Sequence, residues 1–125
     1  MIPLPETIQA FASRLADSGY SVWLIGSRAN GTANETSDWD FLVFGNETLI
    51  GELANQRSIE NLDLLVVYDG NNFRSPWSDN EEGAVKAGSL AAWEWRHVSD
   101  AEATYKGTKW PHDWGSPKQA KRLYS

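Results

Sequence analysis

The feature that most constrains this fold is a polar segment, residues 26–40, placed between two apolar runs of strand length. The segment reads GSRANGTANETSDWD, and the flanking runs are residues 22–25 and 41–44. Short apolar runs bounded by glycine and polar residues are typical of buried strands. The sequence therefore predicts a strand, a polar turn and a second strand, with carboxylates where the second strand begins.

Asp38 and Asp40 are separated by one residue at the start of this second strand. Because side chains alternate between the faces of a strand, both carboxylates are expected on one face, with Cα atoms ~7 Å apart and Trp39 turned away. Two like charges at short range repel each other, and a divalent cation removes that cost. Paired Mg²⁺ ions can activate an attacking oxygen and stabilise a leaving pyrophosphate. The spacing therefore favours metal-dependent phosphoryl chemistry.

Gly26 and Ser27 open the polar segment. A glycine lets the backbone approach phosphate oxygens closely, and Ser27 offers a hydroxyl and an amide donor. The alternative for the whole segment is an ordinary polar hairpin loop whose aspartates are solvated.

The segment resembles the signature of the minimal nucleotidyltransferases of the DNA polymerase beta-like superfamily, in which Gly-Ser is followed by ten residues and then Asp-x-Asp. The resemblance implies an α+β fold, a small mixed β-sheet with helices on one face. It also implies transfer of a nucleoside monophosphate, AMP from ATP, to a protein or small-molecule hydroxyl with release of pyrophosphate. The matching residues are Gly26-Ser27, Arg28-Ala29, Gly31-Thr32-Ala33 and Ser37-Asp38-Trp39-Asp40.

The catalytic set of this family includes a third carboxylate from a later strand, and Asp63 in the apolar run 62–68 matches that position. An acidic residue at the head of an apolar strand needs a reason, although a surface position at the strand edge would supply one. Asp69, beside Gly70 at the other end of the run, is the competitor, and turn formation explains it.

By resemblance, a metal site of two Mg²⁺ ions is implied, with Asp63 also able to accept the proton of the attacking hydroxyl. The resemblance implies that Asp38, Asp40 and Asp63 are both the metal ligands and the catalytic residues. Nucleotide binding is implied for Gly26, Ser27 and Arg28, the first two at the terminal phosphates. Arg28 fits equally well a pairing with a phosphate or with a carboxylate that orients the loop.

The chain is acidic, with 17 aspartates and glutamates against 11 lysines and arginines and a net charge of -6. Proteins that hold duplex DNA or RNA usually present a basic surface, so a polynucleotide substrate is disfavoured. A nucleoside triphosphate remains compatible, because a bound metal supplies positive charge locally.

The 125 residues fit a single nucleotidyltransferase-like domain, residues 1–125. The absence of cysteine excludes disulfides, thiolate zinc sites and cysteine nucleophiles. The N-terminus lacks a basic start followed by an apolar run, and no stretch approaches the ~20 apolar residues of a membrane span. A cytoplasmic protein with no membrane association is the expectation.

Periodicity and turn residues predict the remaining elements. The region 69–88 is predicted to be a long surface loop, with one helical turn around 81–87, and the basic tail 117–124 a short helix. The other predicted helices are 5–18 and 47–55, and the predicted strands are 20–25, 39–44, 62–68 and 90–98, the last with a hairpin partner at 103–106.

Tryptophan is unusually frequent, and a tryptophan-rich C-terminal extension begins at about residue 89. Its rings are Trp93, Trp95, Trp110 and Trp114. Such rings can stack on nucleotide bases, bind the acceptor substrate or form a surface for a partner protein. More often they pack in a core. Resemblance also implies settings in which short family members act beside a helical, toxin-like protein as the antitoxin of a toxin–antitoxin pair. The second functional hypothesis is therefore a non-catalytic, nucleotide-binding or partner-docking module.

Overall fold

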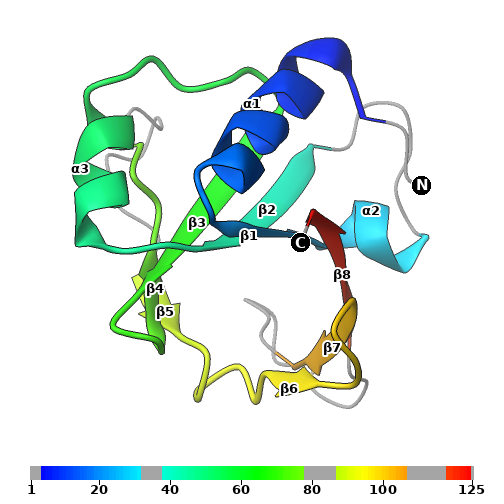
Figure 1. Cartoon of the computed structure of the whole chain (residues 1–125). Coiled ribbons are helices and arrows are strands. Elements are labelled where there is room, and N and C mark those ends of the chain that lie inside the picture. The colour runs from blue at the N-terminus through cyan, green and yellow to red at the C-terminus, as the bar shows by residue number, and fades with distance from the viewer. Residues whose placement is uncertain (1–3, 32–37, 78–86, 107–117, 125) are drawn as a thin grey trace.

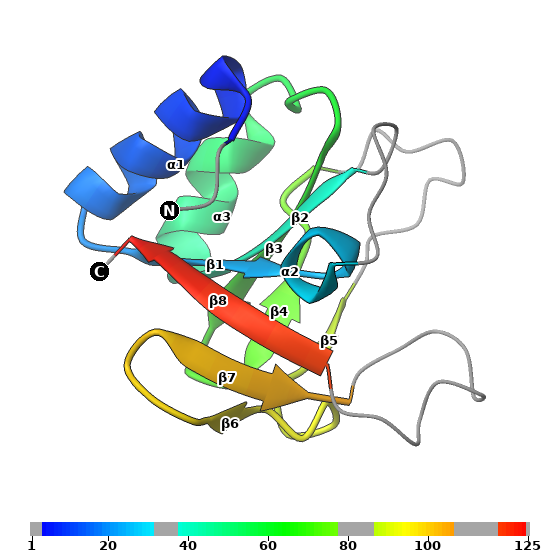
Figure 2. The same ribbon diagram turned by 90° about the vertical axis from the view of Figure 1, so that its right-hand side faces the viewer.

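The computed structural model describes residues 4–31, 38–77, 87–106 and 118–124. The described chain forms a curled mixed sheet with the helices α1 and α3 on the same side of it (Figure 1). Seen from the side, the strands β6, β7 and β8 bend away beneath the central strands, on the side opposite these helices (Figure 2). The predicted α+β fold class is confirmed.

The helices follow their apolar spacing. Helix α1 (Glu6–Asp17) buries residues three and four positions apart, and its C-terminal end is followed by Gly19 at φ +94°. Helix α3 (Glu47–Ala54) begins at Asn46, whose side-chain oxygen accepts a hydrogen bond of 2.8 Å from the Leu49 N–H. Both helices lie close to their predicted bounds. The buried residues of α1 are Ile8, Phe11, Ala12 and Leu15.

The strand order in the sheet is β5-β4-β3-β2-β1-β8-β7-β6. Strands β2 and β3 pair in parallel, through the crossover that contains α3, and the other described pairs are antiparallel. The strands are β1 (Ser21–Ile25), β2 (Trp39–Phe44), β3 (Leu62–Tyr68), β4 (Asn72–Arg74), β5 (Ala87–Ser89), β6 (Arg96–His97), β7 (Glu102–Tyr105) and β8 (Lys118–Tyr124).

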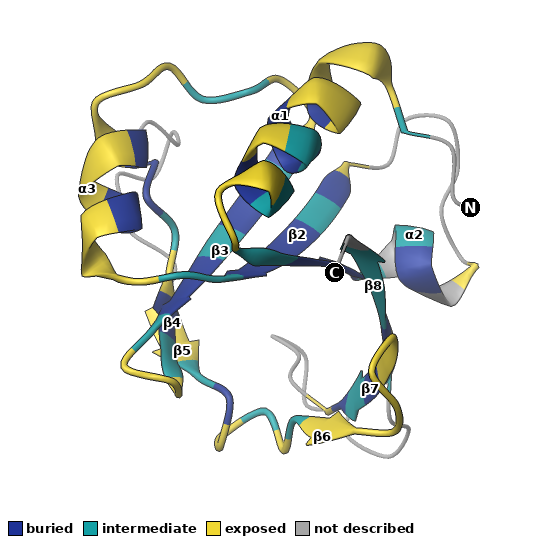
Figure 3. Cartoon of the chain, in the orientation of Figure 1, coloured by how far each residue is buried: buried dark blue, intermediate teal, exposed yellow. Residues whose placement is uncertain are grey.

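Two apolar clusters cover the two faces of the central strands. The helix-side cluster joins α1 and α3 to one face, for example through Leu24 and Phe41. The inner cluster lies on the opposite face and joins Trp23 and Leu42 to Tyr105 of β7. Because both faces of β1 and β2 are covered, these strands are nearly continuously buried (Figure 3).

The polar segment differs from a simple turn. Its first residues form a short helix, α2 (Ser27–Asn30), which starts directly after β1. The Ala29 N–H donates to the Gly26 carbonyl at 3.1 Å, so the chain turns helical at once. Residues 32–37 lie outside the described part of the chain.

The prediction of a long loop over 69–88 is wrong for two parts of it, which form β4 and β5. Asp69 and Gly70 both have positive φ, 57° and 76°, and turn the chain back onto β3 as a hairpin. Phe73 then enters the inner cluster, so a three-residue strand is enough to hold the segment. The predicted helical turn lies outside the described residues, apart from Ala87 in β5.

The prediction of a strand over 90–98 is also wrong for most of its length. Residues 90–95 form a turn, in which the Trp95 N–H donates to the Leu90 carbonyl at 3.1 Å, and only Arg96 and His97 join the sheet. The alternation itself has a physical meaning, because Trp93 and Trp95 pack against the inner cluster while the residues between and after them are exposed. The hairpin partner predicted at 103–106 is confirmed as β7.

The C-terminal tail is the strand β8, not the predicted helix. Its charged residues favour a helix locally, but β8 pairs with β1 on one side and β7 on the other. Because β2 pairs with only one edge of β1, the ladder with β8 supplies hydrogen-bond partners for the other edge of β1. Arg122 is held there as well, since its guanidinium donates to the Ser21 hydroxyl at 2.9 Å. Within the described residues, no helix has the length and apolar character needed to span a membrane.

The strand assignment of the tail can be tested at Ala120, which is fully buried in the inner cluster. Ala120→Asp is expected to lower the free energy of unfolding by about 3 kcal/mol or more, because a charge enters an apolar cluster. Gln119→Asp places the same residue at the exposed neighbouring position and is expected to change it by less than about 1 kcal/mol. Urea unfolding measures both, and equal effects of the two substitutions would contradict the strand.

Candidate functional site

The parallel register of β2 and β3 places Asp40 directly beside Asp63. The preceding pair in the register is Trp39 with Leu62, and both of those side chains belong to the helix-side cluster. Because side chains alternate along a strand, Asp40 and Asp63 share the opposite face. Adjacent strands lie ~4.8 Å apart, so the two half-buried carboxylates are neighbours.

Asp38 lies immediately before β2 and is exposed. The ladder between β2 and β3 begins one residue after it, at Trp39. Among the described residues, no group of three or more histidine, cysteine, aspartate or glutamate side chains is arranged to hold a metal ion. The structure brings together Asp40 and Asp63, and the participation of Asp38 stays a prediction.

The donor chemistry of the Asp40–Asp63 pair fits Mg²⁺. Carboxylate oxygens are the ligands this ion prefers, and it is commonly bound through one or two carboxylates together with substrate phosphates. Two carboxylates on adjacent strands also place two negative charges in one half-buried location, which a divalent cation compensates.

Gly26 follows the last residue of β1 and lies against the carboxylate of Asp40. Its neighbour Ile25 is the register partner of Asp40, and Gly26 has φ +73°, where side chains are strained. A Cβ built on Gly26 would lie 3.1 Å from Cγ of Asp40 and still closer to its Oδ2. Only a glycine fits between the end of β1 and this carboxylate, so the two parts of the motif are in direct contact.

The backbone of Gly26 is also held by a residue that the motif analysis missed. The Gly26 N–H donates to the phenol oxygen of Tyr105 at 2.8 Å, across 79 positions of sequence. Tyr105 lies at the end of β7, whose neighbour β8 pairs with β1. No local pattern around Tyr105 predicts this contact, because it depends on the order of the last strands.

Arg28 lies in α2 and packs on Trp39, with its guanidinium carbon 4.4 Å from the centroid of the Trp39 ring. The Trp39 side chain is in the helix-side cluster, on the face of β2 opposite Asp40. This cation–π contact gives Arg28 a packing role. Its nucleotide-binding role stays a prediction, as does that of Ser27, whose backbone begins α2 directly after Gly26.

The described tryptophans of the C-terminal third pack against other rings. Trp93 lies 4.5 Å from Phe73 and stacks on Tyr105 at 5.3 Å between centroids. Trp95 meets Trp23 edge to face at 5.3 Å. These contacts fit the core-packing interpretation of Trp93 and Trp95. Trp110 and Trp114 lie outside the described residues.

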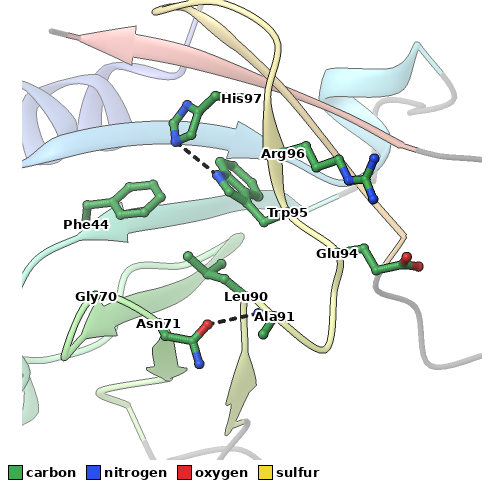
Figure 4. A pocket seen from close by; sticks show the side chains of 9 residues that line it. All are labelled: Phe44, Gly70, Asn71, Leu90, Ala91, Glu94, Trp95, Arg96 and His97. Atoms are coloured by element: carbon green, nitrogen blue, oxygen red, sulfur yellow. Dashed lines mark hydrogen bonds between the residues drawn. The ribbon is translucent and has the colours of Figure 1, made fainter.

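A pocket of about 520 Å³ lies at the other end of the inner face (Figure 4). Phe44, which lines it, is four residues beyond Asp40 on β2, or ~13 Å along the strand. Polar groups of its wall bond to one another, as in the 3.3 Å hydrogen bond from Trp95 Nε1 to His97 Nε2. The pocket is therefore separate from the Asp40–Asp63 pair. Its lining comprises Phe44, Gly70, Asn71, Leu90, Ala91, Glu94, Trp95, Arg96 and His97.

Comparison with known proteins agrees with the motif. A family model described as a nucleotidyltransferase domain matches residues 4–106, a range that contains Gly26, Asp40, Asp63 and Tyr105. Neither the curated proteins nor the solved structures contain a significant match to the chain. The family match covers most of the 125 residues and confirms the resemblance drawn from the motif. The chain therefore belongs to the nucleotidyltransferase domain family.

Proposed function

We propose that the protein is a Mg²⁺-dependent nucleotidyltransferase that moves AMP from ATP to the hydroxyl of a protein or small molecule. Family membership supports nucleotidyl transfer in general. The observation that carries the residue assignment is the register of Asp40 with Asp63, with Gly26 against the first of them. In the reaction, the acceptor oxygen bonds to the α-phosphorus while the bond to pyrophosphate breaks.

The metal ligands in this proposal are Asp40 and Asp63, with Asp38 as the third carboxylate. When bound, Mg²⁺ supplies the positive charge that a triphosphate needs in a protein of net charge -6. Asp63 takes the proton of the acceptor hydroxyl, a role open to a positioned carboxylate. Its place on β3, in the ladder with β2, supports this assignment because a rigid element holds a base in position.

Gly26 and Ser27 form the binding place of the terminal phosphates in this proposal. Gly26 contributes space, because its N–H already donates to Tyr105, and the Ser27 amide is the donor. The left-handed conformation of Gly26 turns the chain from β1 into α2 within one residue, next to Asp40. Phosphate oxygens could therefore reach the Ser27 amide close to the carboxylates that would hold Mg²⁺. A side chain at position 26 would fill that space.

The partner-docking alternative requires a tryptophan-rich surface. The described tryptophans instead contribute to the two clusters, three of them buried and two half-buried, so they do not favour it. They are Trp23, Trp39, Trp77, Trp93 and Trp95. A helical, toxin-like protein stays a predicted partner and acceptor candidate for the catalytic proposal.

Asp40→Asn and Asp63→Asn test the catalytic assignment. Each is expected to lower label transfer from nucleoside triphosphate by about 100-fold or more, because a metal ligand or the base is lost. Both variants keep the size of the side chain and are expected to stay folded, which urea unfolding checks. Assays with each of the four ribonucleoside triphosphates, with and without Mg²⁺, measure transfer and pyrophosphate release.

Asp69→Asn is the matched control, because Asp69 lies in the turn at the other end of β3 and its left-handed backbone suits asparagine. It is expected to retain wild-type transfer. Full activity of Asp40→Asn and Asp63→Asn, or transfer that is independent of Mg²⁺, would contradict the proposal.

Gly26→Ala tests the contact between the turn and Asp40, with Gly31→Ala as its control. Both glycines have φ +73°, but a Cβ on Gly31 meets no atom within 4 Å. Gly31→Ala is expected to lower the free energy of unfolding by about 1 kcal/mol, the cost of the left-handed backbone alone. Gly26→Ala is expected to cost more and to reduce transfer by about 100-fold, since it displaces Asp40. Equal effects on stability and transfer would show that the contact is unimportant.

A further inference from the structure

We propose that Tyr105 is a positioning residue for nucleotide binding, which acts by fixing the Gly26 turn against Asp40. The inference rests on the proposed nucleotidyl transfer and deepens it. It assigns a role in the site to the C-terminal third of the chain, through a hydroxyl that touches the turn and not the reacting atoms.

Gly26 lies where β1 leaves the sheet. The register with β2 ends at Ile25 opposite Asp40, and the register with β8 runs from Val22 to Leu24. A backbone N–H just beyond a strand end requires a new acceptor when it is partly buried. The phenol oxygen of Tyr105 is that acceptor, at 2.8 Å.

Tyr105 is itself firmly held. Its side chain is 3% exposed, and its backbone pairs with Lys118 at the start of β8. Its ring stacks on Trp93 at 5.3 Å and on Trp95 at 6.1 Å, with interplanar angles of 23° and 25°. These two ring contacts and the burial restrict the χ angles of Tyr105, so the hydroxyl is held in a fixed position beside Gly26.

The consequence for the site follows from the chain geometry. Gly26 is the residue with the most backbone freedom in the turn, and the next amide along the chain is that of Ser27. The hydrogen bond to the Gly26 N–H fixes the peptide plane between Ile25 and Gly26, on the N-terminal side of this flexible glycine. The Ser27 amide is then oriented relative to Asp40 before any nucleotide arrives, which reduces the entropy lost on binding.

Tyr105→Phe tests the inference, because it removes the hydroxyl and keeps the stacked ring. KM for the Mg²⁺–ATP complex is expected to rise by roughly 2- to 12-fold, the range of one hydrogen bond, with a smaller change in kcat. A merely structural role would lower kcat through the folded fraction and leave KM unchanged. Tyr68→Phe is the matched control on β3, with expected wild-type kinetics.

A second measurement follows the Gly26 amide by NMR in the wild-type protein and in Tyr105→Phe. The Gly26 amide is expected to exchange slowly with solvent and to remain protected when Mg²⁺–ATP is added, and its NMR shift is expected to move in Tyr105→Phe. Wild-type KM in Tyr105→Phe, or tighter nucleotide binding by that variant, would overturn the inference while leaving the proposed function intact. If the wild-type protein neither binds nor transfers any nucleotide, the proposed function fails and the inference fails with it.

Discussion

The parallel pairing of β2 with β3 is the interaction on which the rest of the structure depends. It sets a register that places Asp40 beside Asp63 and buries Trp39 and Leu62 on the other face. A shift of one residue in either strand would exchange the faces, moving a carboxylate into the helix-side cluster and an apolar side chain out of it. The packing of α1 and α3 on that cluster therefore stabilises the register, and the register positions the carboxylates.

The opposite face of the same strands imposes the second requirement. Asp40 and Asp63 share it with large apolar residues such as Trp23 and Leu42, which have to be covered. The chain covers them with its own last strands, and the sheet curls so that Trp93 and Tyr105 close over the inner cluster. The side chains that bury this face thus also come to the edge of the site, where Tyr105 meets Gly26.

Elements with strong local signals were predicted correctly. The bounds of β2 and β3 agree with the sequence, because their residues are apolar enough to form strands in any arrangement that buries them. The errors are at β4, β5 and β8. Their short or charged sequences form strands only because a neighbouring strand offers an unpaired edge for backbone hydrogen bonds. The prediction for residues 90–95 was wrong for a different reason. The alternation of tryptophan with polar residues there indicates which side chains point inward, but it does not determine the backbone conformation.

The sequence by itself determined the family, because the Gly-Ser and Asp-x-Asp pattern of residues 26–40 depends only on local spacing. The sequence also identified Asp63 as a candidate site residue, because a charged residue at the start of an apolar strand is apparent from the local sequence. Only the tertiary structure decided that Arg28 packs on Trp39 and that Tyr105 holds the Gly26 amide. Those contacts join segments whose proximity follows from the strand order and the curl of the sheet, and both depend on burying the whole chain at once.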